Sequence, residues 1–329
     1  MSNNTNFCLK IAFFDTKPYD IQFFQPEIDK FNQTNRCKIE PVYFSENINL
    51  SLLSQVSEAT AVCVFVNDVV NREILDELKK LSIDAVALRC AGFDQVDYQY
   101  AKSLGIKVFR VPAYSPHSVA EHTLALLLSV DRKIHRAYNR TRDNNFSLEG
   151  LVGFDLFGKT IGIVGTGKIG AIVAEICRAF GMQVLLYDKY PNLDLASKIS
   201  AQYVDLEFLL QNSDVISLHC PLSTETYHLL NKQAFAQMKD GVIIINTARG
   251  GLIDSEALVE AIKSGKVRGA GLDVYEFERE YFFKDLSNQV VQDPILAQLL
   301  LFNNVVITSH QAFLTVEALT AIALSLIHI

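Results

Sequence analysis

The sequence predicts an α/β protein of two domains, each built around a doubly wound parallel β-sheet. With 329 residues, the chain is longer than one typical domain. Short apolar runs rich in β-branched and aromatic residues alternate with stretches of helical period, which is the pattern of buried parallel strands joined by helices. A glycine-rich turn, from Gly165 to Gly170, stands directly between one such run and a helical stretch. All three observations favour the same architecture.

The first third of the chain contains four strand candidates, with stretches of helical period between and after them. One of these helical stretches is NREILDELKKL, from Asn71, where apolar residues recur with helical period. The strand candidates are LKIAFFD from Leu9, AVCVFV from Ala61, DAVALR from Asp84 and IKVFRV from Ile106. These segments predict the first parallel sheet.

A change of pattern at Pro112 marks the crossover between the domains. Ser115 is placed to cap a long helix, and Pro116 stands at its first position, where a missing N–H costs little. A basic stretch with Arg132 and Lys133 follows, which we interpret as a solvated helix face.

The second α/β unit starts at Lys159 and runs to about His310. Its strand candidates are TIGIVG, QVLLYD, VISLHC, VIIINT, GAGLDV and NVVITS. A second crossover near Ser309 would return the chain to the first domain. We therefore expect one domain over residues 1–112, completed by residues 311–329, and another over residues 113–310.

Composition restricts the class of function. The 30 basic and 37 acidic residues give a net charge of −7, which disfavours nucleic acid and anionic membranes as partners. The six cysteines contain no Cys-x-x-Cys pair, so we expect no metal site, and reduced thiols fit a cytoplasmic location. The first residues, MSNNTNF, do not resemble a signal peptide, and no apolar run is long enough to span a membrane. A small-molecule substrate is therefore expected.

The glycine-rich turn predicts a dinucleotide site. Gly165 permits the tight turn, Gly167 lets the backbone approach a pyrophosphate, and Gly170 lets helix and strand lie close together. The following helix then presents free N–H groups to the phosphates. Asp188 ends the next strand, where a carboxylate binds the adenosine ribose and repels a 2′-phosphate. The predicted cofactor is NAD rather than NADP.

Three later residues have the chemistry needed to reduce a 2-oxo acid. Arg249 follows the predicted strand VIIIN, and a guanidinium can grip a carboxylate and polarise a carbonyl. His310 can donate a proton near neutral pH, and Glu278 could hold its tautomer. Taken singly, each is more often structural, and spacing alone does not bring them together.

From Lys10 to about Ala323 the chain resembles the D-isomer-specific 2-hydroxyacid dehydrogenases, above all the fermentative D-lactate dehydrogenases of proteobacteria. The matching segments are ALRCAGFDQVD, RVPAYSPHSVAEH, RTRDNNFSLEGL, GIVGTGKIG, SLHCPLSTETYHLLN, NTARGGLIDSEAL, GLDVYEFEREYFF and ITSHQAFLTVEALT. The resemblance implies a flavodoxin-like substrate domain and a Rossmann NAD-binding domain, with the active site in a cleft between them.

The resemblance also assigns roles to individual residues. Arg249, Glu278 and His310 would be the catalytic trio, with His310 as acid and base. Cofactor contacts would come from Gly165, Gly167, Lys168, Ile169, Gly170, Asp188, Cys220, Pro221, Thr226, Thr247, Ala248, Arg249 and Asp273. The substrate would contact Ala91 and Gly92 through its carboxylate, together with Arg249, and Phe65, Tyr114 and Phe313 around its side chain.

The function implied is the reversible NADH-dependent reduction of pyruvate to D-lactate by a cytoplasmic homo-oligomer, a dimer or tetramer formed through the NAD domain. Two alternatives remain. One is a sister dehydrogenase for glycerate, phosphoglycerate or a bulkier hydroxy acid, although an aromatic, uncharged pocket disfavours a phosphorylated substrate. The other is a non-catalytic NAD-sensing regulator of the same fold.

The end of the chain departs from this family. Leu324 to Ile329 matches the translation of a transposon-end adapter used in sequencing libraries, so we expect the natural chain to continue through a further helix. His328 therefore receives no functional role.

Overall fold

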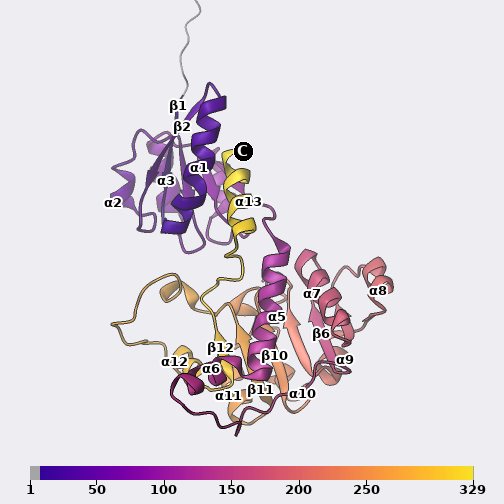
Figure 1. Cartoon of the computed structure of the whole chain (residues 1–329). Helices are drawn as coiled ribbons and strands as arrows, with labels where there is room; N and C mark the ends of the chain where they lie inside the picture. Colours follow the sequence, from indigo (N-terminus) through magenta and orange to yellow (C-terminus); the bar gives the residue numbers. More distant parts are fainter. Residues whose placement is uncertain (1–7, 329) are drawn as a thin grey trace, which may run out of the picture. The chain divides into compact units, whose positions relative to one another are not determined.

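The computed structural model describes residues 8–328 (Figure 1). The segment MSNNTNF, which carries the prediction about a signal peptide, and Ile329 lie outside the described residues. The chain forms two compact units. Unit 1 contains the described residues up to Ser115 and those from Leu314 onward, and unit 2 is Pro116–Phe313.

Unit 1 is built on a five-stranded sheet in the order β2-β1-β3-β4-β5, with parallel pairing at every step. Its strands are β1 (Cys8–Phe13), β2 (Lys38–Tyr43), β3 (Ala61–Val64), β4 (Ala85–Leu88) and β5 (Lys107–Arg110). The strand order reverses between β1 and β3. In doubly wound sheets, ligands bind beyond the carboxyl ends of the strands at such a reversal.

Helices surround this sheet, and several begin at side-chain caps. Asn71 and Asp97 accept the N–H groups of Ile74 and Tyr100 at the first turns of α3 and α4. The helices are α1 (Pro18–Thr34), α2 (Leu50–Leu53), α3 (Arg72–Lys80), α4 (Tyr98–Ser103) and α13 (Val316–Ile327). The last helix, α13, lies beside α1, so the end of the chain rejoins the first unit (Figure 1).

Unit 2 is built on a seven-stranded parallel sheet in the order β12-β11-β10-β9-β6-β7-β8. Its strands are β6 (Thr160–Val164), β7 (Gln183–Tyr187), β8 (Gln202–Tyr203), β9 (Val215–Leu218), β10 (Val242–Asn246), β11 (Val267–Leu272) and β12 (Val305–Ile307). Here the order reverses between β6 and β9, which predicts a ligand site beside the turn after β6.

The helices of unit 2 cover both faces of this sheet. They are α5 (Pro116–Arg132), α6 (Ile134–Arg142), α7 (Lys168–Ala179), α8 (Leu193–Ile199), α9 (Leu206–Asn212), α10 (Lys232–Gln237), α11 (Ser255–Lys263) and α12 (Pro294–Leu301), with short 3-10 helices η1 (Gly250–Leu252) and η2 (Glu278–Glu280). The long α5 packs against β10, β11 and α7 (Figure 1).

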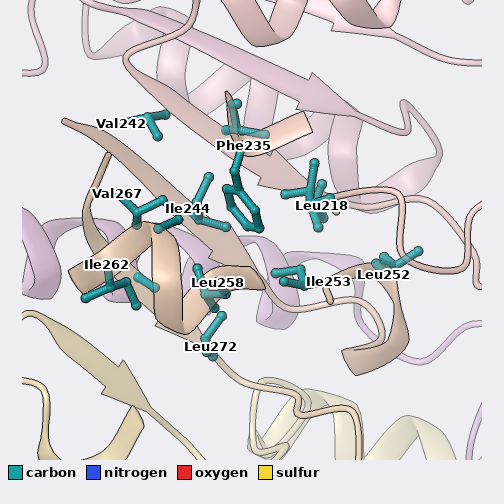
Figure 2. Close-up of a cluster of buried hydrophobic side chains, with 14 of the residues drawn as sticks. Leu218, Phe235, Val242, Ile244, Leu252, Ile253, Leu258, Ile262, Val267 and Leu272 are labelled. Carbon is teal, nitrogen blue, oxygen red and sulfur yellow. The ribbon is translucent and has the colours of Figure 1, made fainter. Parts of the chain in front are cut away.

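Strand β10 lies inside the sheet, with both faces buried, which explains why its first four residues are all apolar. Ile244 belongs to the hydrophobic cluster on one face of the sheet, whereas Ile243 and Ile245 belong to the cluster on the other. Figure 2 shows Ile244 among side chains that include Phe235 from α10 and Leu258 from α11. Each fully buried isoleucine side chain contributes about 2 kcal/mol to the free energy of unfolding. These clusters therefore hold the strand ends in place.

The structure confirms the predicted class of two parallel-sheet α/β domains. Two of the strands, β2 and β8, were not predicted from the sequence. Both are edge strands: β2 contains Pro41 and is mostly half-exposed, and β8 has only 2 residues. Within residues 8–328, no helix combines the length and apolar character needed to cross a membrane.

Candidate active site

The glycine turn after β6 requires glycine at two positions. Gly165 has a φ of +94°, and a Cβ there would lie 2.5 Å from the backbone N of Cys220. A Cβ on Gly170 would lie 1.9 Å from the carbonyl oxygen of Gly165. The turn therefore lies directly against the loop after β9 and against the first turn of α7.

Gly167 differs from these two glycines because a Cβ at this position would meet nothing within 4 Å. It is the N-cap of α7, followed by Lys168 and Ile169 in the first helical turn. The open space over this backbone and the free N–H groups of the helix fit a pyrophosphate. The residues present therefore match the phosphate part of a dinucleotide.

Asp188 follows β7 and lies on the same turn. Its Oδ2 accepts hydrogen bonds from the Thr166 N–H at 2.6 Å and the Thr166 hydroxyl at 3.1 Å. Its Oδ1 accepts the N–H of Tyr190 at 2.8 Å. The fold thus brings the predicted ribose-binding carboxylate to the glycine turn, as NAD recognition requires.

Asp273 follows β11, and the remaining predicted cofactor residues follow the neighbouring strands β9 and β10. After β9, the Thr226 hydroxyl donates to the carbonyl of Pro221 at 2.7 Å, and burial raises the pKa of the Cys220 thiol to about 11. After β10, the hydroxyl of Thr247 lies 2.9 Å from that of Thr123, and Ala248 N–H donates to the Asn246 side chain. All of these residues therefore lie at the carboxyl edge of the sheet.

His310 and Glu278 form a close pair, as predicted for an acid and its partner. The Nδ1 atom of His310 lies 2.7 Å from Oε1 of Glu278, and both side chains are 17% exposed. The other oxygen of Glu278 accepts the N–H of Tyr275 at 2.9 Å, so both carboxylate oxygens are engaged. With Nδ1 held by a carboxylate, Nε2 is the nitrogen left to exchange a proton.

The backbone of His310 is held in an unusual conformation, with a φ of +54°. Its N–H donates to the carbonyl of Asp273 at 2.7 Å. The buried carboxylate of Asp273 in turn accepts the N–H groups of Gln311 and Ala312, each at 2.9 Å. Asp273 therefore fixes the turn on which His310 stands.

Two more residues support this turn and were not among the predicted site residues. The Thr308 hydroxyl donates to Asp273 at 2.6 Å, and Nε2 of His122 lies 3.4 Å from the same oxygen. Desolvation alone would raise the pKa of Asp273, but the hydrogen bonds from His122, Thr308 and the Ala312 N–H, together with the nearby His310, hold this pKa below its usual value. The sequence signal for such a role was His122, which directly precedes the apolar part of its helix.

Arg249 lies on the loop after β10, directly before η1. Its Nη1 donates to the Ala248 carbonyl at 2.8 Å, and the Asn246 side chain donates to the Arg249 carbonyl at 2.9 Å. A Cβ on the next residue, Gly250, would lie 2.1 Å from the carbonyl carbon of Tyr275. The Arg249 loop therefore touches the segment that leads to Glu278.

The predicted substrate residues divide between the units. Phe65, Ala91, Gly92 and Tyr114 belong to unit 1, whereas Arg249 and Phe313 belong to unit 2. Phe65 follows β3 and is buried, and Ala91 and Gly92 follow β4. The Phe313 side chain is also buried. Tyr114 lies on the segment after β5, and Phe313 lies on the segment after β12. In each unit, the predicted substrate residues therefore come after the carboxyl ends of parallel strands.

Comparison with known proteins shows to which family this fold and these site residues belong. Residues 124–312 match the family described as D-isomer specific 2-hydroxyacid dehydrogenase, NAD binding domain. The chain belongs to the D-isomer-specific 2-hydroxyacid dehydrogenase family. The family resemblance seen in the sequence is thereby confirmed, and so is the prediction of NAD as the cofactor.

Individual members of this family are similar over nearly the whole chain. The D-lactate dehydrogenase of Escherichia coli is 50% identical over 315 residues, which cover 96% of this chain and 94% of that protein. A solved structure of the pyruvate reductase of Chlamydomonas reinhardtii has a TM-score of 0.91 at 37% identity, covering 99% and 96% of the two chains. The D-lactate dehydrogenase of Aquifex aeolicus, solved with NAD and lactic acid, has a TM-score of 0.84 at 35% identity, covering 97% and 93%.

Proposed function

We propose that this chain is a D-lactate dehydrogenase that uses NADH to reduce pyruvate reversibly to D-lactate. The 2.7 Å pair of His310 and Glu278 is the observation that carries the proposal, because a carbonyl reduction needs a proton donor held in one orientation. Support for the substrate comes from the 50% identity to a D-lactate dehydrogenase and from the relative solved with NAD and lactic acid.

His310 would serve as the acid in pyruvate reduction and the base in lactate oxidation. Glu278 accepts the hydrogen bond from Nδ1, stabilises the charged imidazole and directs Nε2 toward the substrate oxygen. Asp273 keeps the His310 turn rigid, so that the proton is delivered from a fixed position.

The cofactor would be held by the glycine turn, with its phosphates at the start of α7 and its ribose at Asp188. When bound, NADH supplies the hydride that reduces C2 of the oxo acid. Asp188 favours NAD over NADP because its charge repels a 2′-phosphate. Cys220, Pro221 and Thr226, with Thr247 and Ala248, would line the rest of the cofactor.

The substrate carboxylate would be bound by N–H groups of the loop Cys90-Ala91-Gly92 and by the guanidinium of Arg249. The small side chain of pyruvate would lie near Phe65, Tyr114 and Phe313. These positions are aromatic and uncharged, which favours an unphosphorylated substrate since a dianion would lose its hydration there without a cation.

We also propose a cytoplasmic homo-oligomer assembled through the NAD-binding domain. The segment after α6 carries Phe146, Leu148, Val152 and Phe157, which are 71%, 80%, 76% and 79% exposed. Apolar side chains gathered in one exposed segment are typical of a protein–protein interface. Cys63 and Cys177 are buried as thiols in the two units, which fits a reducing compartment.

The test follows NADH absorbance with the purified protein and pyruvate, beside 2-oxobutyrate, hydroxypyruvate and an NADPH control. The proposal predicts fast loss of NADH with pyruvate and formation of D-lactate. Preference for hydroxypyruvate would indicate a sister dehydrogenase instead. NADH binding without turnover of any oxo acid would favour the NAD-sensing regulator.

A further inference from the structure

Arg89 is a buried cation that the proposed mechanism does not use. It directly follows β4 in unit 1, and its side chain is only 1% exposed. Burial of a charge is expensive unless hydrogen bonds and an opposite charge compensate it. The contacts that provide this compensation show what the residue does.

The guanidinium joins the carboxyl ends of the two strands between which the strand order reverses. Its Nη2 donates to the carbonyls of Phe14 at 2.9 Å and Asp15 at 3.1 Å, both after β1. Its Nη1 donates to the carbonyl of Cys63 in β3 at 3.3 Å. Because Arg89 itself follows β4, one side chain fixes the ends of three adjacent strands.

A carboxylate from α1 completes this arrangement. Oδ1 of Asp20 lies 3.3 Å from Nε of Arg89, and both side chains are nearly inaccessible to solvent. Desolvation raises the pKa of Asp20, and Arg89 opposes this shift. Packed hydrophobic residues would stabilise such a position as well as a buried ion pair does. The ion pair is therefore better explained by the geometry it imposes than by stability.

That geometry concerns the residues proposed to bind the substrate. The guanidinium carbon of Arg89 lies 5.3 Å from the ring centroid of Phe65, and the next residue along the chain is Cys90. Gln95 extends the arrangement: its amide donates to the Cys90 thiol at 3.1 Å and to the Phe65 carbonyl at 3.4 Å. The Cys90 thiol in turn donates to the carbonyl of Gly92 at 3.2 Å.

We propose that Arg89 is a positioning residue for the oxo acid, which holds Phe65 and the loop Cys90-Ala91-Gly92 in the places that substrate binding requires. This inference rests on the proposed function, because it takes Phe65 and this loop as substrate contacts. A displacement of about 1 Å in such groups lowers reaction rates up to about a hundredfold. Arg89 thus acts through its neighbours and does not touch the substrate.

The test compares Arg89→Lys with a matched control, Leu78→Ala. Lysine keeps the charge but cannot reach the carbonyls of both strands and Asp20 together. Leu78 lies in the core of the same unit on α3, so its truncation destabilises unit 1 without removing a bond to the loop. Steady-state kinetics with pyruvate, NADH binding by fluorescence and urea unfolding are measured for both variants.

The proposal predicts that Arg89→Lys raises KM for pyruvate about tenfold, while its NADH affinity stays within about twofold of the unmodified protein. Leu78→Ala is expected to lose stability with an unchanged KM. An unchanged KM in Arg89→Lys, with reduced stability alone, would make Arg89 a structural residue and overturn the inference.

Two further variants keep the outcome decisive. If Arg89→Lys does not fold, Asp20→Asn removes the charge that faces Nε of Arg89, and an unchanged KM in that variant also overturns the inference. Phe65→Ala separates the inference from the proposed function. If Phe65→Ala leaves KM unaltered, the substrate assignment itself is wrong, whatever the result at Arg89.

Discussion

Replacing Glu278 by glutamine keeps the shape of the side chain but removes the charge beside His310. The two side chains are 2.7 Å apart and each is 17% exposed, so solvent screens the interaction only in part. A charge-assisted hydrogen bond of this kind is worth about 1.5–3 kcal/mol. If it acts in the transition state, kcat/KM for pyruvate should fall about 10–100-fold, since about 1.4 kcal/mol corresponds to each factor of ten.

The assay is the initial rate of NADH oxidation over a range of pyruvate concentrations. Most of the loss should appear in kcat, because Glu278 touches His310 and is not proposed to touch the substrate. Glu280→Gln is the matched control: it makes the same chemical change two residues along the same 3-10 helix, at an exposed position. A Glu278→Gln variant with kcat/KM within about twofold of the unmodified enzyme would refute the role given to this pair.

Three further predictions concern the cofactor turn and its surroundings. Asp188→Ser should reduce the preference for NADH over NADPH about tenfold or more by removing the repelling charge, and an unchanged ratio of their Kd values would contradict this. Gly170→Ala places a Cβ 1.9 Å from the carbonyl oxygen of Gly165. The free energy of unfolding, measured with urea, should therefore fall by about 1–3 kcal/mol, and NADH should bind more weakly. Unchanged stability and unchanged NADH affinity would be inconsistent with the structure. Burial lowers the pKa of His219 from 6.5 to about 3, so only the unfolded state takes up its proton between these values. The free energy of unfolding should therefore fall by up to about 1.4 kcal/mol per pH unit as the pH drops from about 6 to 4. His219→Gln should make this dependence on pH less steep. The same dependence on pH in both proteins would exclude a contribution from His219.

Much of the fold could be predicted from the sequence because local patterns determine it. The apolar run of β10 alternates between two buried faces, and the glycine turn lies between a strand and a helix, as its spacing indicated. The edge strand β2 carried no such signal, since half-exposed residues and Pro41 interrupt its pattern. Local sequence therefore predicted the buried elements better than the edges.

The site was predictable only in part. The pairing of His310 with Glu278 joins residues 32 positions apart, and only the family resemblance suggested it. Asp273 was predicted only as a cofactor contact, yet its carboxylate accepts backbone N–H groups from the turn that carries His310. The partners of a buried charge come from distant segments, as Arg89 and Phe14 illustrate with a separation of 75 residues. Periodicity along the chain carries no information about such contacts.

The most direct test of the proposed D-lactate dehydrogenase activity is the enantiomer of lactate formed from pyruvate and NADH, measured for the unmodified protein beside His310→Asn. We expect D-lactate alone from the unmodified protein, and a fall in kcat/KM of about a thousandfold in the variant, since the proton donor is lost. L-lactate or a racemic product would contradict the assignment. Equal rates in the two proteins would contradict the role of His310.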